Sequence, residues 1–165
     1  MNKILALFIV LISAFVTAQS EPVTVKLEAY VVSTITKEDG TTEEQFSEAK
    51  EARPGQVVEY RVVVTNVSDE TLPASNAVIT GPIPATTAYI ADSATPTSEA
   101  ARLEFSADGG QTFSVPPLMI KVKNDKGEEV EVEATPDQYT AARWVILQSL
   151  EPKQETIFKY RVTVK

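Results

Sequence analysis

Arg53-Pro-Gly-Gln-Val-Val-Glu-Tyr-Arg-Val-Val-Val-Thr-Asn66 is the stretch that decides the fold of this chain. Pro54 and Gly55 predict a turn, and the residues after them alternate in character. One face of the resulting strand carries Val58, Tyr60, Val62 and Val64. Period-two alternation of β-branched and aromatic residues is typical of a strand with one buried face. A second copy closes the chain and shares the string Tyr-Arg-Val-x-Val, with its alternating residues at Phe158, Tyr160, Val162 and Val164. Two such strands predict a sandwich core between them.

Composition limits the classes of protein that this chain can belong to. Its 165 residues suit one domain, and a hydrophobic fraction of 43% favours a folded globule over disorder. The formal net charge of −8 argues against nucleic acid and against an anionic membrane surface as partners. Cysteine and histidine are both absent, which removes disulfides, the commonest general base and the commonest metal ligand.

The first residues have the three parts of a secretory signal peptide. Met1-Asn2-Lys3 is a positive start, Ile4 to Val16 is apolar except for Ser13, and small residues follow up to Ala18. The alternative is a membrane anchor, but this run is shorter than the ~20 residues that cross a bilayer. The sequence predicts a cleaved signal peptide over 1–18 and a single domain over 19–165. It also predicts export to the periplasm, cell surface or extracellular space, with no membrane span in the mature chain.

Short strands and turns fill the region around the deciding stretch. Val23 to Val32 alternates as a first strand whose apolar face is Val23, Val25, Leu27, Ala29 and Val31. Asp39-Gly40 predicts a hairpin-type turn, and Phe46 is compatible with either a short strand or a helical turn. Further strands are predicted at Ala77–Thr80, which Gly81-Pro82-Ile83-Pro84 is expected to stop, and at Thr87–Ala91. Ser93 to Ala101 is predicted to be an exposed loop.

Two hairpins and a buried strand are predicted in the second half. Leu103-Glu-Phe-Ser is expected to pair with Gln111-Thr-Phe-Ser across Ala107-Asp-Gly-Gly110. Met119–Lys123 is expected to pair with Glu129–Glu133 across Asn124–Gly127, with an apolar face and a face of opposite charges. Arg143–Leu147 should place Trp144 and Ile146 inward. About nine strands without a helical period predict an all-β protein, an Ig-like antiparallel β-sandwich.

The order of these motifs resembles a known family. Pro54-Gly55 with its strand is followed by Asn76-Ala-Val-Ile-Thr, Pro82-Ile83-Pro84 and Phe105-Ser-Ala-Asp-Gly-Gly-Gln-Thr-Phe113, and then by Ala142-Arg-Trp-Val and the closing strand. This order is similar to the repeat domain of bacterial and archaeal surface proteins called domain of unknown function eleven, in a single copy over about 53–165. The resemblance implies an Ig-like sandwich in an exported or envelope protein, without catalytic residues to carry over. The family commonly has Asp where Gly81 stands and Gly where Ala85 stands.

No motif assigns chemistry to particular residues. Ser106-x-Asp108-x-Gly110-x-Thr112 fits the Asp-box turn of sialidase-type propellers, but one copy favours a structural hairpin. Carboxylates are plentiful, yet nothing selects a glycosidase pair, and Glu43-Glu44 and the Glu128–Glu133 run are expected to be solvated. Asp108 or Asn124-Asp125 could contribute to a calcium site, although no complete calcium loop exists. We therefore assign no catalytic, cofactor-binding or metal-binding residue, and expect no cofactor and no enzyme activity.

Three functions remain open. The leading hypothesis is a non-catalytic exported sandwich with a structural or interaction role at the cell surface or envelope. A more specific form is a filament subunit that donates its strand 23–32 to a neighbour; pairing within the same domain is the simpler alternative. The third is a soluble module for glycan or protein, with an exposed aromatic or acidic patch at 84–101 or 36–52. Core packing is the expected role of Tyr60, Trp144 and Tyr160, rather than a platform for glycan.

Overall fold

Strands make up nearly all the regular structure of this protein. The computed structural model describes residues 21–74 and 77–165, so the predicted signal peptide lies outside the described residues. The elements are β1 (Val23–Thr36), β2 (Thr42–Glu48), β3 (Val57–Asn66), β4 (Val78–Pro82), β5 (Thr87–Tyr89), β6 (Ala101–Ser106), β7 (Met119–Lys123), β8 (Glu129–Glu133), β9 (Ala141–Ile146) and β10 (Glu155–Val164), with one 3-10 turn at Pro136–Gln138. The described part of the chain contains no α-helix, and the all-β prediction is confirmed.

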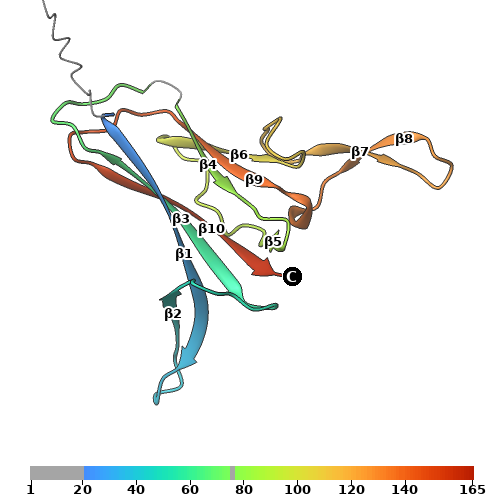
Figure 1. Ribbon diagram of the computed structural model, residues 1–165, viewed down its shortest axis with the longest axis horizontal. Helices are drawn as coiled ribbons and strands as arrows, with labels where there is room; N and C mark the ends of the chain where they lie inside the picture. Colours follow the sequence, from blue (N-terminus) through green and yellow to red (C-terminus); the bar gives the residue numbers. More distant parts are fainter. Residues whose placement is uncertain (1–20, 75–76) are drawn as a thin grey trace, which may run out of the picture.

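Two antiparallel sheets face each other across a shared core (Figure 1). One has five strands in the order β2-β1-β3-β10-β5, and the other has three in the order β4-β9-β6. A separate two-stranded sheet, β7-β8, extends from the body (Figure 1). The predicted antiparallel β-sandwich is therefore confirmed.

The deciding stretch forms β3, in the middle of the larger sheet. It pairs with β1 on one side and with β10 on the other, where Tyr60 lies opposite Tyr160. Val58, Val62 and Val64 are buried, as the alternation predicts. The two strands with the shared string are thus direct neighbours in one sheet, so the prediction of a core between them was wrong; their apolar side chains form one wall of the core.

The smaller sheet supplies the opposite wall through β9. Trp144 is fully buried and stacks on Phe158 of the larger sheet, with ring centroids 5.2 Å apart. Its indole nitrogen donates a hydrogen bond of 2.8 Å to the carbonyl oxygen of Thr95. A buried tryptophan with a satisfied N–H is a large apolar anchor, so Trp144 joins the two sheets at their centre.

Strand β4 does not stop where the prolines were expected to stop it. It continues through Gly81 and Pro82, which pair with β9. The backbone N–H of Ile83 donates to Thr140, so by alternation the nitrogen of Pro82 faces away from β9. Among the described strands, β4 pairs only with β9 and is an edge strand. A proline whose missing donor faces outward is tolerated at such an edge.

The hairpin predicted from Leu103 to Ser114 is only partly formed. Strand β6 pairs with β9, whereas residues 111–114 contribute one bridge, in which Phe105 and Ser114 exchange two backbone hydrogen bonds. The carboxylate of Asp108 accepts hydrogen bonds from the backbone N–H groups of Gln111 and Thr112. Those donors are therefore not available for a regular ladder.

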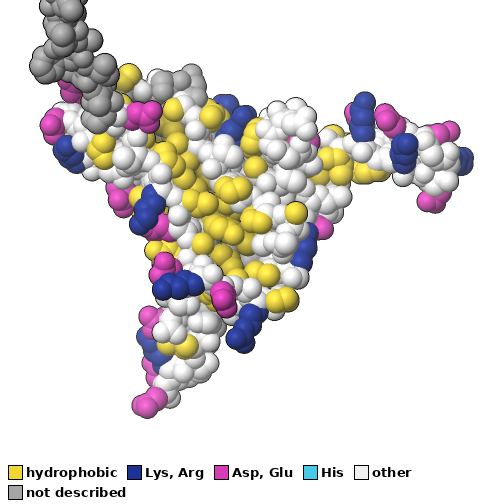
Figure 2. All heavy atoms as spheres, in the orientation of Figure 1, with side chains coloured by type: hydrophobic (Ala, Val, Ile, Leu, Met, Phe, Trp, Pro, Cys, Tyr) yellow, Lys and Arg dark blue, Asp and Glu magenta, His cyan; other side chains and the backbone are white. Residues whose placement is uncertain are grey.

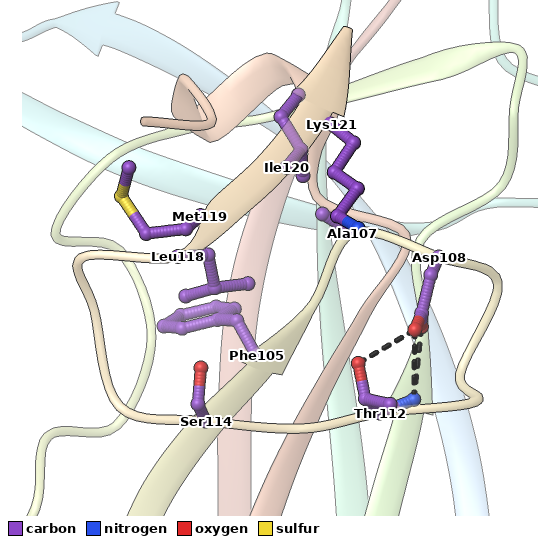
Figure 3. A pocket seen from close by; sticks show the side chains of 9 residues that line it. All are labelled: Phe105, Ala107, Asp108, Thr112, Ser114, Leu118, Met119, Ile120 and Lys121. Atoms are coloured by element: carbon purple, nitrogen blue, oxygen red, sulfur yellow. Dashed lines mark hydrogen bonds between the residues drawn. The ribbon is translucent and has the colours of Figure 1, made fainter. Parts of the chain in front are cut away.

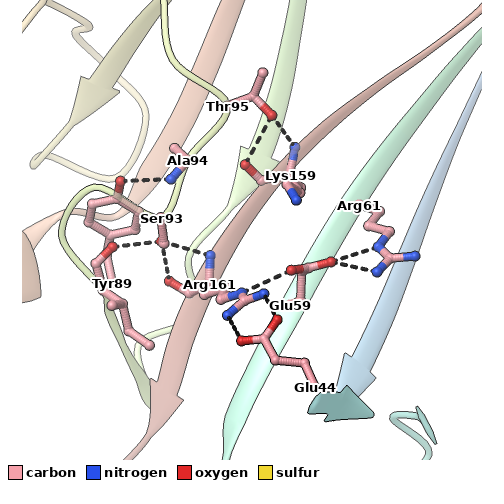
Figure 4. Close-up of polar contacts among 10 residues, drawn as sticks. Glu44, Glu59, Arg61, Tyr89, Ser93, Ala94, Thr95, Lys159 and Arg161 are labelled. Carbon is pink, nitrogen blue, oxygen red and sulfur yellow. Dashed lines mark hydrogen bonds and ion pairs between the residues drawn. The ribbon is translucent and has the colours of Figure 1, made fainter. Parts of the chain in front are cut away.

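The segment predicted to be an exposed loop, Ser93 to Ala101, is partly buried and attached to β10. The hydroxyl of Ser93 accepts from the backbone N–H of Arg161 at 2.9 Å, and the hydroxyl of Thr95 accepts from that of Lys159 at 2.9 Å (Figure 4). Ala94 is buried in the core. Strand β5 is also shorter than predicted, because the chain turns at Asp92 with a positive φ of 58°.

The first strand is longer than predicted and incompletely covered. Residues around Phe46 form strand β2, which settles the open alternative in favour of a strand. The exposed fractions of Val25 and Leu27 are 56% and 47%, although both share a face with buried Val64 and Val62. The three-stranded sheet cannot cover all five strands opposite it, so this part of β1 carries exposed apolar surface (Figure 2).

Candidate interaction surfaces

The aromatic residues singled out in the sequence lie in the core. Trp144 and Tyr160 are fully buried, and Tyr60 is half-buried and stacks on Tyr160 with centroids 5.3 Å apart. The hydroxyl of Tyr160 donates to the carbonyl oxygen of Pro82 in β4, and burial raises its pKa. Core packing was the predicted role of these residues and is confirmed, so they do not form an exposed aromatic platform.

Asp108 organises a tight turn after β6. Its carboxylate accepts from the hydroxyl of Ser106 at 2.7 Å, from the hydroxyl of Thr112 at 2.6 Å and from the backbone N–H groups of Gln111 and Thr112. The hydrogen bonds from Thr112 are the largest cause of a pKa well below the usual range for aspartate. The motif thus has the structural geometry expected of it, with its oxygens engaged by the chain itself.

Acid should weaken this turn, and the substitution Asp108→Asn should show how much the ionised carboxylate contributes to stability at each pH. A carboxylate whose folded pKa lies below its unfolded value of about 4 stabilises the fold above that pH, and this contribution is lost as the pH falls through the folded pKa. We expect Asp108→Asn to lower the melting temperature at pH 7, by an amount that shrinks progressively below about pH 4. Thermal unfolding of both proteins from pH 7 to pH 2 measures this. The control is Asp125→Asn in the β7–β8 turn, and a gap that stays constant with pH would contradict the prediction.

A hollow of about 420 Å³ lies beside this turn (Figure 3). Phe105, Leu118 and Ile120 give it apolar walls, while Thr112 and Lys121 lie on its polar side. Its size is within the range of small-molecule sites, about 300–1,000 Å³. Asp108 also borders it, but its oxygens are already engaged in the turn. Lys121 is therefore the charged group that this hollow offers to a ligand.

A buried carboxylate joins the strands on the outer face of the larger sheet (Figure 4). Glu59 has an exposed fraction of 0%. It accepts hydrogen bonds from the Nε atoms of Arg61 at 2.7 Å and Arg161 at 2.9 Å. Arg161 also makes a two-point ion pair with Glu44 of β2, at 2.7 and 2.6 Å. Glu44 was expected to be simply solvated; instead it ties β2 to β10, and its pKa is lowered by the hydrogen bonds from Arg161.

Arginine also stacks on aromatic rings in this cluster. The guanidinium carbon of Arg61 lies 4.6 Å from the ring centroid of Tyr30 and 4.7 Å from that of Phe46. Such cation–π contacts contribute about 0.5–1 kcal/mol at exposed sites. The contact with Phe46 links β2, all of whose residues are exposed, to β3, in addition to the ladder that pairs β2 with β1.

A second arginine cluster fixes the Asp108 turn to the smaller sheet. Glu104 is buried and pairs with Arg102 and Arg143, while the guanidinium of Arg143 lies 4.0 Å from the ring centroid of Phe113. Burial alone would raise the pKa of Glu104, but the hydrogen bonds from Arg143 and Arg102 bring it below its usual value. Both buried glutamates are therefore held between arginines within the scaffold.

Sequence reasoning missed both clusters, although one signal pointed to the first. Tyr60 and Tyr160 occupy the same place in the shared string, and pairing them across antiparallel strands puts Glu59 opposite Arg161. Knowing that these two strands are neighbours would have predicted the ion pair. The Glu104 cluster had only a partial signal: Arg102 lies two residues away in the same strand, whereas Arg143 comes from a distant strand.

The β7–β8 hairpin, which we call the arm, extends away from the sandwich (Figure 1). Its strands and register match the prediction: Lys121 lies opposite Glu131, and Lys123 lies opposite Glu129. Asn124 shapes its turn by accepting from the backbone N–H groups of Lys126 and Glu128. The arm therefore presents charged groups at a distance from the core, while its apolar residue Ile120 packs against the core at the base.

Comparison of the chain with models of protein families, with curated proteins and with solved structures found no match. The resemblance to the surface-protein repeat thus stays a prediction. Within residues 21–74 and 77–165, no group of three or more acidic side chains is arranged to hold a metal ion. The same part of the chain contains no helix that could span a bilayer.

Proposed function

We propose that this protein is a non-catalytic, exported β-sandwich with a structural or interaction role at the cell surface or in the envelope. The predicted signal peptide supports export, and the family resemblance over residues 53–165 supports a location at the surface. The partners that we expect are an envelope or extracellular protein, a glycan or a second copy of this chain. The acidic charge argues against nucleic acid.

The observation that carries the proposal is that two buried carboxylates and the carboxylate of the β6 turn are all engaged within the scaffold. Glu59 and Glu104 are each held by two arginines, and Asp108 closes a turn. Hydrolysis by paired carboxylates needs one of them to be kept protonated as the general acid. Glu104 and Asp108 instead have lowered pKa values. Their environment suits a scaffold and does not suit acid catalysis.

Locating the native protein and determining its assembly state is the direct test. Cells are separated into culture supernatant, periplasm and envelope, and the protein is followed by size-exclusion chromatography and negative-stain microscopy. We expect it outside the cytoplasm, in the envelope fraction or in assemblies. Recovery from the cytoplasm would overturn the proposal. A free exported monomer would favour the second candidate, a soluble glycan- or protein-binding module.

Two observations favour that second candidate. The hollow beside Asp108 is large enough for a small ligand. The predicted patch at 36–52 coincides with the exposed β1–β2 hairpin, which carries Phe46 and the exposed acidic residues Glu38, Glu43, Glu48 and Glu51. Binding of envelope glycans to the monomer, measured by calorimetry, would distinguish this function.

Strand donation by β1 has a separate test. In the structure, residues 23–32 pair with β3 of the same chain, which is the simpler of the two arrangements. Deleting residues 21–33 exposes the edge of β3. We expect a loss of stability with an unchanged assembly state, because the deleted strand pairs internally. An assembly that becomes a monomer after the deletion would instead support donation of β1 to a neighbour.

A further inference from the structure

Beyond its base, where Ile120 packs against the core, the arm lacks the support that short strands usually need. Among the described strands, β7 and β8 pair only with each other, and they extend away from the sandwich (Figure 1). An isolated two-stranded hairpin is marginally stable at best in water, and a third strand or a packed face is needed for independent stability. A neighbour that extends the arm would therefore stabilise it.

The two faces of the arm differ in chemistry. Ile120 opposite Val132 and Val122 opposite Val130 make an apolar stripe on one face. The other face carries the charges, and these are separated by strand: β7 has Lys121 and Lys123, and β8 has Glu129, Glu131 and Glu133. Figure 2 shows both signs of charge around the outer half of the arm and apolar side chains nearer its base. Each strand thus has its own sign of charge.

The same charged residues direct their backbone groups to the free edges. The N–H of Asn124 donates to Glu128, and that of Ala134 donates to Leu118. Alternation in an antiparallel pair then assigns the internal hydrogen bonds to the apolar residues, such as Val122 and Val130. The backbone N–H and C=O groups of Lys121 and Lys123 point outward from β7, and those of Glu129 and Glu131 point outward from β8.

Charge complementarity selects one way to extend this sheet. Pairing β7 with a second β7 would place lysines opposite lysines, and pairing β8 with a second β8 would oppose glutamates; both are unfavourable. Pairing β7 with the β8 of another molecule places lysine opposite glutamate and repeats the internal register. It also keeps the apolar stripe continuous from one arm to the next.

We propose that β7 of one molecule pairs antiparallel with β8 of a second copy of this chain, joining arms head to tail. The inference rests on the proposed structural function and names the partner. Such a contact uses different surfaces on the two copies, so it does not close on itself and generates an open row of molecules. Each contact is short, so association is expected to depend strongly on concentration.

Proline substitution at the two edges tests this arrangement. Lys121→Pro removes an outward N–H from β7, and Glu131→Pro removes one from β8, while the internal hydrogen bonds of the arm are kept. In sedimentation velocity the wild-type protein should form open-ended oligomers as its concentration rises. Each variant alone has only one of the two edges that a contact needs, so it should remain monomeric. An equimolar mixture should give a discrete species of roughly twofold monomer mass, because one intact β7 edge meets one intact β8 edge.

A charge exchange within the arm gives an independent test. One variant exchanges the charges of the two strands through four substitutions: Lys121→Glu, Lys123→Glu, Glu129→Lys and Glu131→Lys. It preserves both the net charge of the protein and the opposite-charge pairs within the arm. This variant should assemble with itself but not with the wild type, since a mixed contact opposes like charges. Fluorescence of the single tryptophan, Trp144, checks in every variant that the core is folded.

The outcomes separate this inference from the proposed function. A wild-type protein that stays monomeric at millimolar concentration overturns the arm contact, as does association of either proline variant alone or free mixing of the charge-exchanged chain with wild type. None of these results changes where the native protein is found in the cell. Finding the native protein in the cytoplasm would overturn the proposed function, even if the purified protein associates through its arms.

Discussion

Replacing Arg161 by methionine should lower the free energy of unfolding by about 2–4 kcal/mol, one of the two largest effects that we expect in this protein. Arg161 is one of the two arginines that pair with Glu59, and it holds Glu44 of β2 as well. Its loss leaves a fully buried carboxylate with Arg61 alone. Removing one partner of a buried pair costs more than the pair itself contributes, because the remaining charge stays desolvated.

Urea unfolding followed by the fluorescence of Trp144 measures this effect. The matched control is Lys159→Met, a basic residue of the same strand whose side chain is exposed; it should change stability by less than about 0.5 kcal/mol. Adding Glu59→Gln to Arg161→Met should recover part of the loss, since the buried charge is then gone. Equal stabilities of the two methionine variants would show that the cluster contributes nothing to the fold.

Replacing Gly81 by alanine should destabilise the protein by about 2–3 kcal/mol through steric overlap alone. A Cβ atom at this position would lie 2.5 Å from Cε1 of Tyr160, whose ring is fully buried. The ring cannot move away without disturbing the core and the hydrogen bond from its hydroxyl to Pro82. Thr80→Ala, whose side chain is exposed in the same strand, is the control and should be nearly neutral.

A double-mutant cycle isolates the contact between these two residues. Tyr160→Leu alone leaves a cavity, and Gly81→Ala partly fills the space that the ring vacates. The combined variant should therefore be more stable than the sum of the single losses predicts, by about 1 kcal/mol or more. Strict additivity would mean that Tyr160 is not what excludes a side chain at position 81.

The same contact explains why glycine stands at position 81. The strand pattern alone offered no reason for a glycine there. In the structure, the ring of Tyr160 occupies the space that any Cβ at position 81 would need. The glycine is thus required by a residue about eighty positions away, which no local pattern could reveal.

The alternation of apolar and polar residues predicted the strands whose two faces differ. It did not predict the places where side chains bind the backbone groups that a regular ladder would use. Strands β3 and β10 and the arm were predicted because their apolar and polar residues alternate, whereas β9 was predicted as a buried strand around Trp144 and Ile146. Residues 111–114 do not form the expected strand, since Asp108 binds their backbone donors. Strand β4 passes through Pro82 because its outer edge is unpaired among the described strands. Both outcomes depend on contacts that local propensity does not encode.

The candidate surfaces were predictable to different degrees. The charges and apolar stripe of the arm follow from its alternating sequence, so its chemistry was evident before its position. The buried role of Glu59 depended on knowing that β3 and β10 are adjacent. The hollow beside Asp108 required the path of residues 107–121. The sequence therefore indicated which charged and apolar side chains each strand carries. Pairing between distant strands decided which of the charged side chains are buried in ion pairs.

The arrangement of β1, β3 and β10 determines how this fold would carry mechanical load. Strands β1 and β10 flank β3 and both run antiparallel to it, so they are parallel to each other. β1 begins opposite Asn66, and β10 runs to the other end of β3, beside Val57. A pulling force applied between Val23 and Val164 would act along the strands and load the flanking ladders in shear. Hydrogen bonds in a sheared ladder share the force and must break together, whereas a peeled strand loses them one by one. The sandwich is thus oriented to resist tension between its two ends.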